Sequence, residues 1–261
     1  DIDPDSLEMD YKDADQIVRK YKNKIAAIMI CSPFGYPVNL EKTINFFSKY
    51  NIPIIFDFAD AIINTFNFKE KKNLFYTFSF HPTKNIPSNE SGMIIADKKK
   101  EEVLKSIINF GFYGKRRDIA YRGFNGKFTE YDAAILEANL RGFNKRRKKI
   151  IKISKYLISK LNNKSLIIQK NYGLNWFSLK MVLRHKSENF EEVCKKLKRK
   201  NIEIFKPWTL NNMHEYKPFK NFKKTKLKNT LQISKKIFCI PIYIDMKENH
   251  LDYLISQLNK I

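Results

Sequence analysis

The sequence has few of the residues that mark several whole classes of protein. Its 261 residues include three cysteines, four histidines and eight glycines. The cysteines are widely separated and lack a CxxC spacing, which argues against a disulfide framework or a zinc site and favours a reducing compartment. The scattered histidines form no ligand cluster, so no metal is expected. No apolar run has the length of a membrane span and no signal peptide opens the chain, so we expect a cytoplasmic protein.

Acidic residues are also scarce, since 27 stand against 50 lysines and arginines and the formal net charge is +23. Such a surplus can attract nucleic acid or anionic lipid. The lysines are spread over nearly every segment, and asparagine and isoleucine are abundant too, which favours the codon bias of an AT-rich genome as the cause. The densest basic group is Lys145-Arg146-Arg147-Lys148-Lys149. We interpret it as a solvated helix face, and a nucleic-acid site is the alternative.

Hydrophobic residues make up 43% of the chain, which is enough for a sizeable core. In the first part, apolar segments of strand and helix character alternate. This pattern predicts an α/β fold with a mostly parallel sheet covered by helices on both faces. The expected strands are residues 26–30, 53–56, 75–80 and 93–96, and the expected helices are residues 39–50 and 98–109.

The second part has a different pattern. The pattern of residues 131–161 predicts one long helix or two abutting helices. We place a domain boundary within it, so that residues 1–145 form a large domain and residues 146–261 a small C-terminal α+β domain. The elements expected there are strands at residues 176–183, 202–205 and 237–242, and helices at residues 190–200 and 247–258.

Two charged residues lie where predicted parallel strands end. Asp57 closes an apolar strand, and Lys84 follows an aromatic strand by a few residues. In parallel sheets, ligands bind beyond the carboxyl ends of the strands. An amine and a carboxylate are the two groups that pyridoxal phosphate (PLP) requires, because a lysine forms a Schiff base and an aspartate keeps the pyridine nitrogen protonated. The plainer alternatives are a surface lysine and an aspartate that caps the next helix.

Two neighbouring side chains fit the same cofactor. Ser79, five residues before Lys84, can donate its hydroxyl to the cofactor phosphate. Ala59 lies two positions after Asp57 in an extended stretch, so both side chains are expected on the same side. The small side chain of Ala59 could then pack flat on the cofactor ring.

Several short segments follow one another in an order that resembles a known family. They are Ser-Pro-Phe-Gly-Tyr-Pro at 32–37, Ile-Phe-Asp-Phe-Ala-Asp at 55–60, Ser-Phe-His-Pro-Thr-Lys at 79–84, Asn-Phe-Gly-Phe-Tyr-Gly at 109–114, Asn-Gly-Lys-Phe-Thr-Glu at 125–130 and Cys-Ile-Pro-Ile-Tyr at 239–243. Together they resemble the DegT/DnrJ/StrS-type sugar aminotransferases, PLP enzymes of the aspartate-aminotransferase fold. The resemblance runs through nearly the whole chain, and its order and spacing are more specific than any single segment.

The resemblance implies a role for each matched residue. Lys84 would form the internal aldimine, Asp57 would hold the pyridine nitrogen and Ser79 would contact the phosphate. Asn125 would reach the phosphate in the neighbouring subunit, which implies a homodimer with shared active sites. The implied reaction moves an amino group from glutamate to a nucleotide-linked keto-deoxysugar of the dTDP-4-keto-6-deoxyhexose type, as in polysaccharide biosynthesis. Residues 1–145 would be the PLP-binding domain.

The sequence also departs from the family pattern. Asp60 stands beside the cofactor where the family usually has Gln or His, and its charge could repel the phenolate oxygen of PLP. Phe58 replaces a small residue, and Ser91 replaces a turn glycine. Asp1 begins in what resembles mid-domain sequence, so we expect a large domain truncated at its N-terminus. A truncated or non-catalytic homologue that acts as a binding or assembly module is therefore the alternative to an active enzyme.

Overall fold

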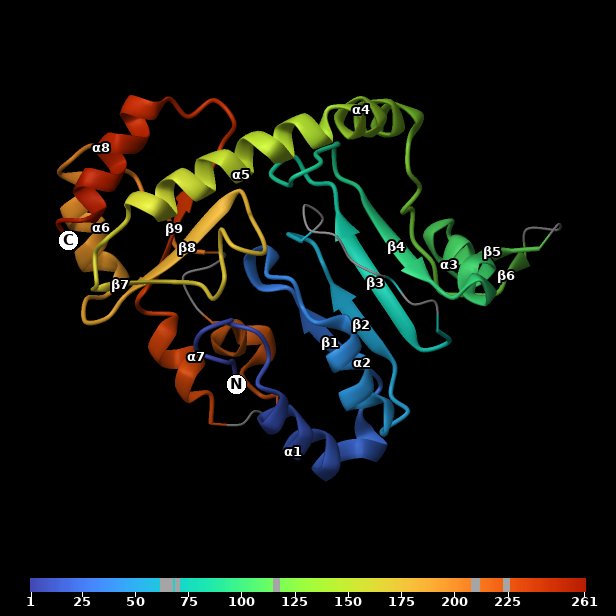
Figure 1. Ribbon diagram of the computed structural model, residues 1–261. Helices are drawn as coiled ribbons and strands as arrows, with labels where there is room; N and C mark the ends of the chain where they lie inside the picture. Colours follow the sequence, from blue (N-terminus) through green and yellow to red (C-terminus); the bar gives the residue numbers. More distant parts are fainter. Residues whose placement is uncertain (62–67, 69–70, 115–117, 208–211, 223–225) are drawn as a thin grey trace. The chain divides into compact units, whose positions relative to one another are not determined.

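The computed structural model describes residues 1–61, 68, 71–114, 118–207, 212–222 and 226–261 (Figure 1). The chain forms two compact units, which are described separately. The sheet unit comprises Asn23–Ser32 and Val38–Phe143, and the C-terminal unit comprises Asp1–Lys22, Pro33–Pro37 and Asn144–Ile261. The domain limits 1–145 and 146–261 stay a prediction. No helix among the described residues is long and apolar enough to cross a membrane.

The sheet unit contains a four-stranded sheet. Its strands, in spatial order, are β1 (Ile28–Cys31), β2 (Ile54–Asp57), β3 (Leu74–Ser79) and β4 (Gly92–Ala96). β1, β2 and β3 are parallel, and β4 runs antiparallel to β3. The predicted α/β fold with a mostly parallel sheet is confirmed. Because three parallel strands end at the same edge, their last residues come together there.

One face of this sheet forms an aromatic core. Ile30, Phe56 and Phe58 are fully buried, and Tyr76 is 1% exposed. The Phe56 and Tyr76 rings stack with their centroids 5.2 Å apart. Full burial of an apolar side chain of this size contributes about 1.5–3 kcal/mol, so this face stabilises the sheet. The strand pattern, with alternate apolar residues pointing inward, is the reason these segments form strands rather than helices.

The other face differs from the expected two-sided cover. Met29 is 55% exposed and Ile94 is 48% exposed. Successive side chains of a strand point to opposite faces, so the exposure of Met29 and Cys31 beside the buried Ile28 and Ile30 means that β1 is covered on one face. The described part of the sheet unit therefore carries an apolar face that reaches solvent.

Helix α4 (Glu130–Arg141) holds the loop that follows β3. Thr129 caps the helix, since its hydroxyl accepts a hydrogen bond from the Asp132 amide. The Ser88 hydroxyl donates to the Asp132 carbonyl at 2.9 Å, and the Asn139 amide donates to the Pro87 carbonyl at 2.8 Å. These two bonds fix the end of the loop that contains Lys84.

The sheet unit also contains two further helices and a small separate hairpin. Asn39 caps α2, because its side chain accepts a hydrogen bond from the Lys42 amide at 2.9 Å. The elements are α2 (Leu40–Ser48), α3 (Glu101–Ile108), β5 (Phe112–Tyr113) and β6 (Asp118–Ile119), the last two paired as an antiparallel hairpin.

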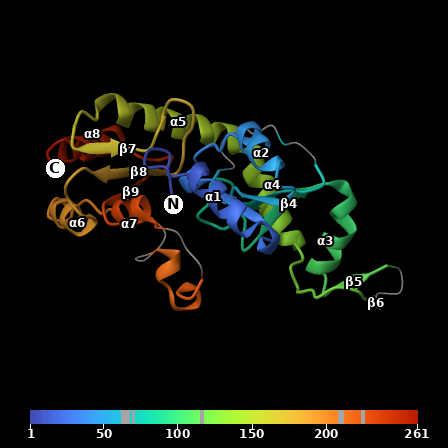
Figure 2. The ribbon, with the colours of Figure 1, turned by 90° about the horizontal axis from the view of Figure 1, so that it is seen from below.

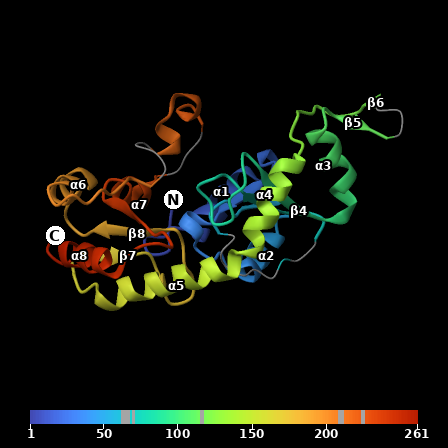
Figure 3. The ribbon, with the colours of Figure 1, turned by 90° about the horizontal axis from the view of Figure 1, so that it is seen from above.

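The C-terminal unit has an antiparallel sheet of β7 (Leu166–Ile168), β8 (Lys180–His185) and β9 (Ile237–Pro241). Figures 2 and 3 show α5 (Phe143–Lys160) and α8 (Glu248–Leu258) along one face of it. The Tyr156 hydroxyl of α5 donates to the Asp252 carboxylate of α8 at 2.6 Å. α7 (Lys228–Ile233) covers the other face, where Ile233 packs with Val182 and Cys239. α1 (Tyr11–Tyr21) and α6 (Phe190–Lys198) complete the unit.

Of the two alternatives predicted for residues 131–161, the structure has two abutting helices, which break at Gly142. Two predicted elements of the second part need correction. The strand predicted from Trp176 starts at Lys180, because Trp176 is buried in a loop where its indole donates to the Lys170 carbonyl. Residues 202–205 make only an isolated bridge from Phe205 to β9, and Pro207 just beyond lacks the amide needed to extend a ladder. Helix α7 and the β5–β6 hairpin were not predicted.

Candidate active site

Asp57 is the last residue of β2, and it lies at the carboxyl edge of the sheet. In the register of the sheet, Asp57 pairs with Cys31 of β1 and with Thr77 of β3. One carboxylate oxygen accepts a hydrogen bond from the Ala59 amide at 3.0 Å, which turns the chain immediately after the strand. The other oxygen accepts from the Cys31 thiol, with Sγ and Oδ2 3.8 Å apart. The carboxylate is thereby held in place by its own backbone and by the neighbouring strand.

Cys31 is a neighbour of this site that the sequence did not single out. Although Cys31 is exposed on the open face of β1, neighbouring atoms partly desolvate its side chain, and this desolvation together with the adjacent Asp57 carboxylate raises the pKa of the Cys31 thiol to about 11. The thiol therefore stays protonated at neutral pH and acts as a hydrogen-bond donor rather than a nucleophile. The signal in the sequence was its position at the end of an apolar strand, equivalent to Asp57 in the next strand.

Lys84 lies in the turn beyond β3. Its amide donates to the His81 carbonyl at 2.8 Å, which closes the turn. Its ammonium forms an ion pair with Asp60, with Nζ and Oδ1 2.7 Å apart and about a tenth of each side chain exposed. The structure thus brings together Lys84 and Asp60, two of the predicted site residues, from loops that follow adjacent parallel strands.

Asp60 is held by its backbone as well. The Asn85 side-chain amide donates to the Asp60 carbonyl at 3.2 Å. The amide oxygen of Asn85 is buried and has no hydrogen-bond partner among the described residues. Phe58, which stands where the family has a small residue, points to the other side of the strand from Asp57. Its ring stacks on Phe56 and Tyr76 in the buried core. Its size therefore does not crowd the face that carries Asp57.

Ser79 ends β3 and pairs with Gly92 of β4. Its hydroxyl accepts a hydrogen bond from the His81 amide at 3.2 Å and retains its own proton for a further acceptor. Nearby, the His81 ring contacts the Thr83 hydroxyl at 2.9 Å and pairs with Glu90 at 3.3 Å. The turn from Ser79 to Lys84 is therefore built largely from short side-chain contacts to its own backbone.

Within the part of the chain that the structure describes, no hydrogen bond joins Asn125 to this group. It lies in the segment before α4, where it forms an isolated antiparallel bridge with Asn109. Lys127 in the same segment lies over the Phe110 ring, with Nζ 5.0 Å from the centroid. The predicted site residues thus divide into a cluster of Asp57, Ala59, Asp60, Ser79 and Lys84 at the sheet edge, and Asn125 on a separate segment.

The residues at the sheet edge fit the chemistry of PLP. Asp57 presents a carboxylate, Ser79 a hydroxyl donor, and Lys84 an amine, all on the ends of β2 and β3 or the loops that follow them. The buried, unpartnered Asn85 amide oxygen and Ser91 hydroxyl lie in the same loops. No three His, Cys, Asp or Glu side chains gather into a metal site in the part of the chain that the structure describes.

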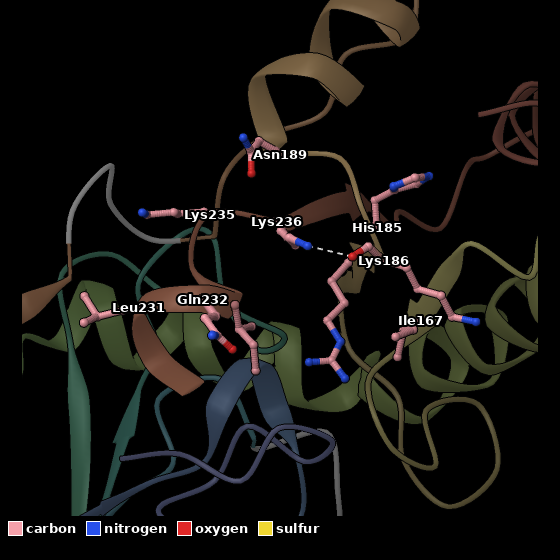
Figure 4. A pocket seen from close by; sticks show the side chains of 10 residues that line it. Ile167, His185, Lys186, Asn189, Leu231, Gln232, Lys235 and Lys236 are labelled. Carbon is pink, nitrogen blue, oxygen red and sulfur yellow. Dashed lines mark hydrogen bonds between the residues drawn. The ribbon is translucent and has the colours of Figure 1, made fainter. Parts of the chain in front are cut away.

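A pocket of the C-terminal unit has a volume of about 540 Å³ (Figure 4). Arg184, Lys186, Lys235 and Lys236 line it, without an acidic residue among its lining. The Lys236 ammonium, however, donates to the Lys186 carbonyl at 2.6 Å, and Arg184 pairs with Asp5 at 3.5 Å. Two of the four cations are therefore used within the fold, and none of the predicted site residues lies in this pocket.

Comparisons with known proteins give a consistent result. The sequence profile described as the DegT/DnrJ/EryC1/StrS aminotransferase family matches residues 1–259. A "dTDP-4-amino-4,6-dideoxy-D-glucose transaminase" of Shigella dysenteriae is 24% identical over 248 residues, which cover 90% of this chain and 66% of that protein. A "UDP-4-amino-4,6-dideoxy-N-acetyl-beta-L-altrosamine transaminase" of Campylobacter jejuni is 28% identical over 133 residues, 49% of this chain and 35% of that protein. The chain thus spans two thirds or less of the length of these relatives.

Solved structures agree with the fold. A putative PLP-dependent aminotransferase from Bacillus cereus superposes with a TM-score of 0.87 at 25% identity, over 99% of this chain and 72% of that one. A DegT DnrJ EryC1 StrS aminotransferase from Brucella abortus superposes with a TM-score of 0.87 at 17% identity, over 100% of this chain and 72% of that one.

Proposed function

Because this chain belongs to the DegT/DnrJ/EryC1/StrS aminotransferase family, we propose that it serves PLP-dependent transfer of an amino group to a nucleotide-linked keto-sugar. One observation carries the proposal. The Asp57 carboxylate and the Lys84 amine follow adjacent parallel strands at the carboxyl edge of one sheet. PLP, when bound, supplies an electron sink for the proton shift that defines transamination.

Each residue of the cluster has a proposed task. Lys84 would bind the cofactor aldehyde covalently through its amine and later carry the proton of the shift. Asp57 would make a charge-assisted hydrogen bond to the ring nitrogen, which is about twice as strong as a neutral one. Ser79 would donate its hydroxyl to the phosphate, and Ala59 would leave room for the flat ring.

The partners are proposed from the relatives. The names of the Shigella and Campylobacter relatives refer to dTDP- and UDP-linked amino sugars. We propose a nucleotide sugar of the dTDP-4-keto-6-deoxyhexose type as the amino acceptor, and glutamate as the donor. Asn125 would act on the phosphate of a neighbouring subunit in a homodimer, which accounts for its separation from the sheet-edge cluster.

Detection of a covalent bond between PLP and Lys84 tests the proposal directly. The chain is incubated with PLP, reduced with borohydride to make the link permanent, and digested for mass spectrometry. We expect the cofactor mass on the peptide that contains Lys84. Lys84→Arg should abolish this adduct, while the control Lys98→Arg, a surface lysine after β4, should retain it. An adduct spread over many lysines, or one that survives Lys84→Arg, would refute the assignment.

The alternative is that the protein keeps the fold as a binding or assembly module without catalysis. It is favoured by the exposed apolar side chains of the sheet, such as Met29 and Ile94. The same borohydride experiment separates the two proposals, because a module without catalysis would leave Lys84 unmodified. Turnover with glutamate and a keto-sugar nucleotide would then confirm the enzyme.

A further inference from the structure

Asp60 is in direct contact with the nitrogen that matters most in the proposed reaction. Its Oδ1 lies 2.7 Å from Lys84 Nζ, and both side chains are about 90% buried. At this distance and burial, a carboxylate and an ammonium interact strongly, because little water screens them. We propose that Asp60 is the counter-ion of the Lys84 nitrogen. It stabilises the positive charge on this nitrogen both before and after the cofactor is attached. The second half of this inference rests on the proposed function.

The Nζ of Lys84 in the ion pair is the same atom that would join the cofactor carbon. Formation of that bond releases water and leaves a nitrogen that can carry one proton and one positive charge, so the net charge at the atom is unchanged. The Asp60 backbone is fixed by the Asn85 side chain at 3.2 Å, and the residue follows β2 by three positions. A carboxylate held in this way stays within reach of the nitrogen.

The other titratable groups of these loops are engaged elsewhere. Asp57 accepts hydrogen bonds from the Ala59 amide and the Cys31 thiol. His81 lies 3.3 Å from the Glu90 carboxylate and 2.9 Å from the Thr83 hydroxyl. Asp60, by contrast, places its carboxylate in direct contact with Lys84 Nζ. This explains the acidic residue at a position where the sequence pattern led us to expect an amide or imidazole.

A cofactor-free experiment tests the first half. The chain is treated with formaldehyde and cyanoborohydride, and the methylation rate of each lysine is measured by mass spectrometry. Only a neutral amine reacts, so a counter-ion slows the reaction. We expect Asp60→Asn to speed methylation of Lys84 by about tenfold or more, because the ammonium loses the carboxylate that contacts it at 2.7 Å. Asp60→Glu, which restores the carboxylate, should bring the rate back toward wild type.

A control variant distinguishes charge from general loosening. Asp132 is also a buried carboxylate of the sheet unit, 8% exposed and bonded to Thr129. Asp132→Asn should leave the Lys84 rate unchanged. Thermal melts identify any variant that does not fold. If Asp60→Asn fails to fold, Asp60→Gln takes its place, and the ¹⁵N signal of Lys84 in the wild-type protein must be that of a protected ammonium. Equal Lys84 rates in wild type and Asp60→Asn, or a neutral or freely exchanging amine signal, would overturn the proposal.

The cofactor-bound protein tests the second half by spectroscopy. The protonated and neutral forms of the bond between Lys84 and the cofactor differ in absorbance. A pH titration followed by absorbance therefore gives the midpoint of protonation of the linked nitrogen. We expect this midpoint to fall by about 1–3 pH units in Asp60→Asn and to stay close to wild type in Asp60→Glu. An unchanged midpoint in Asp60→Asn would show that Asp60 does not act on the linked nitrogen. If the wild type binds no cofactor, the proposed function fails, and the methylation experiment still decides the counter-ion role.

Discussion

Lys84 and Asp60 lie 24 residues apart in the sequence, and their charged groups meet at 2.7 Å at the carboxyl edge of the sheet. Removal of one partner of a buried pair leaves the other charge without compensation, which costs about 3–5 kcal/mol. Lys84→Met should therefore lower the free energy of unfolding by about this amount, measured by urea denaturation. The double variant Lys84→Met/Asp60→Asn should recover part of the loss.

An exposed ion pair of the same unit provides the matched control. Lys105 and Glu101 lie 2.6 Å apart on α3, with 71% and 50% of their side chains exposed. Solvent screens such a pair, so Lys105→Met should change the urea midpoint little. Equal losses of stability for Lys84→Met and Lys105→Met would mean that the buried pair stabilises the fold no more than the exposed pair does.

Asp57 should determine how tightly PLP is bound. Asp57→Asn removes the charged acceptor of the proposed hydrogen bond to the ring nitrogen but keeps the side-chain shape. A hydrogen bond to a charged group contributes about 1.5–3 kcal/mol, so the cofactor dissociation constant should rise about 10- to 150-fold. Equilibrium titration with PLP, followed by absorbance, measures it. Asp132→Asn is the control, and an unchanged constant in Asp57→Asn would remove Asp57 from the site.

Asp57, Ser79 and Lys84 could be predicted because strand ends are visible in a sequence. Apolar and aromatic runs of four to six residues mark β2 and β3, and ligand sites of parallel sheets lie just beyond such ends. The fold class followed from the same alternation. Asn125 was found by resemblance alone, since no local pattern of charge or periodicity marks its segment.

The contacts of the site could not be predicted. The ion pair of Asp60 depends on the path of two loops after their strands, and the approach of Cys31 to Asp57 depends on the register of β1 against β2. Periodicity in a sequence shows which residues share a face but not which loop atoms meet. For the same reason, the contact of Asp60 with Lys84 was not foreseen, and the expected effect of Asp60 on the cofactor oxygen stays a prediction.

Gly92 is needed where β4 begins. A Cβ at this position would lie 2.7 Å from the Phe78 carbonyl oxygen, closer than backbone atoms allow. Because Gly92 pairs with Ser79, Gly92→Ala should push β4 away from the end of β3. We expect a loss of about 1–3 kcal/mol in the free energy of unfolding by urea. Met93→Ala, at the next position of β4, serves as the comparison, and an equal or smaller loss in Gly92→Ala would show that the strand has room to shift.

The Cys31 thiol should be unreactive because its pKa is raised to about 11 by desolvation and by the Asp57 carboxylate. At pH 8 its thiolate fraction is about ninety times smaller than that of a cysteine with the ordinary pKa of 9.0, so alkylation with iodoacetamide should be slower by a similar factor. Asp57→Asn should speed the alkylation of Cys31, measured against Cys194 in the same digest. A Cys31 rate typical of a free thiol would contradict the raised pKa.

The same pKa predicts how stability depends on pH. The folded thiol keeps its proton up to about pH 11, whereas the unfolded thiol loses it near its ordinary pKa of 9.0. The unfolded state therefore binds fewer protons than the folded state between about pH 9 and 11, and stability falls as the pH rises through this window. Cys31→Ser lacks this contribution, so its urea midpoint should fall less than that of wild type between pH 8 and pH 11. Parallel curves for the two proteins would show that the thiol titrates alike in both states.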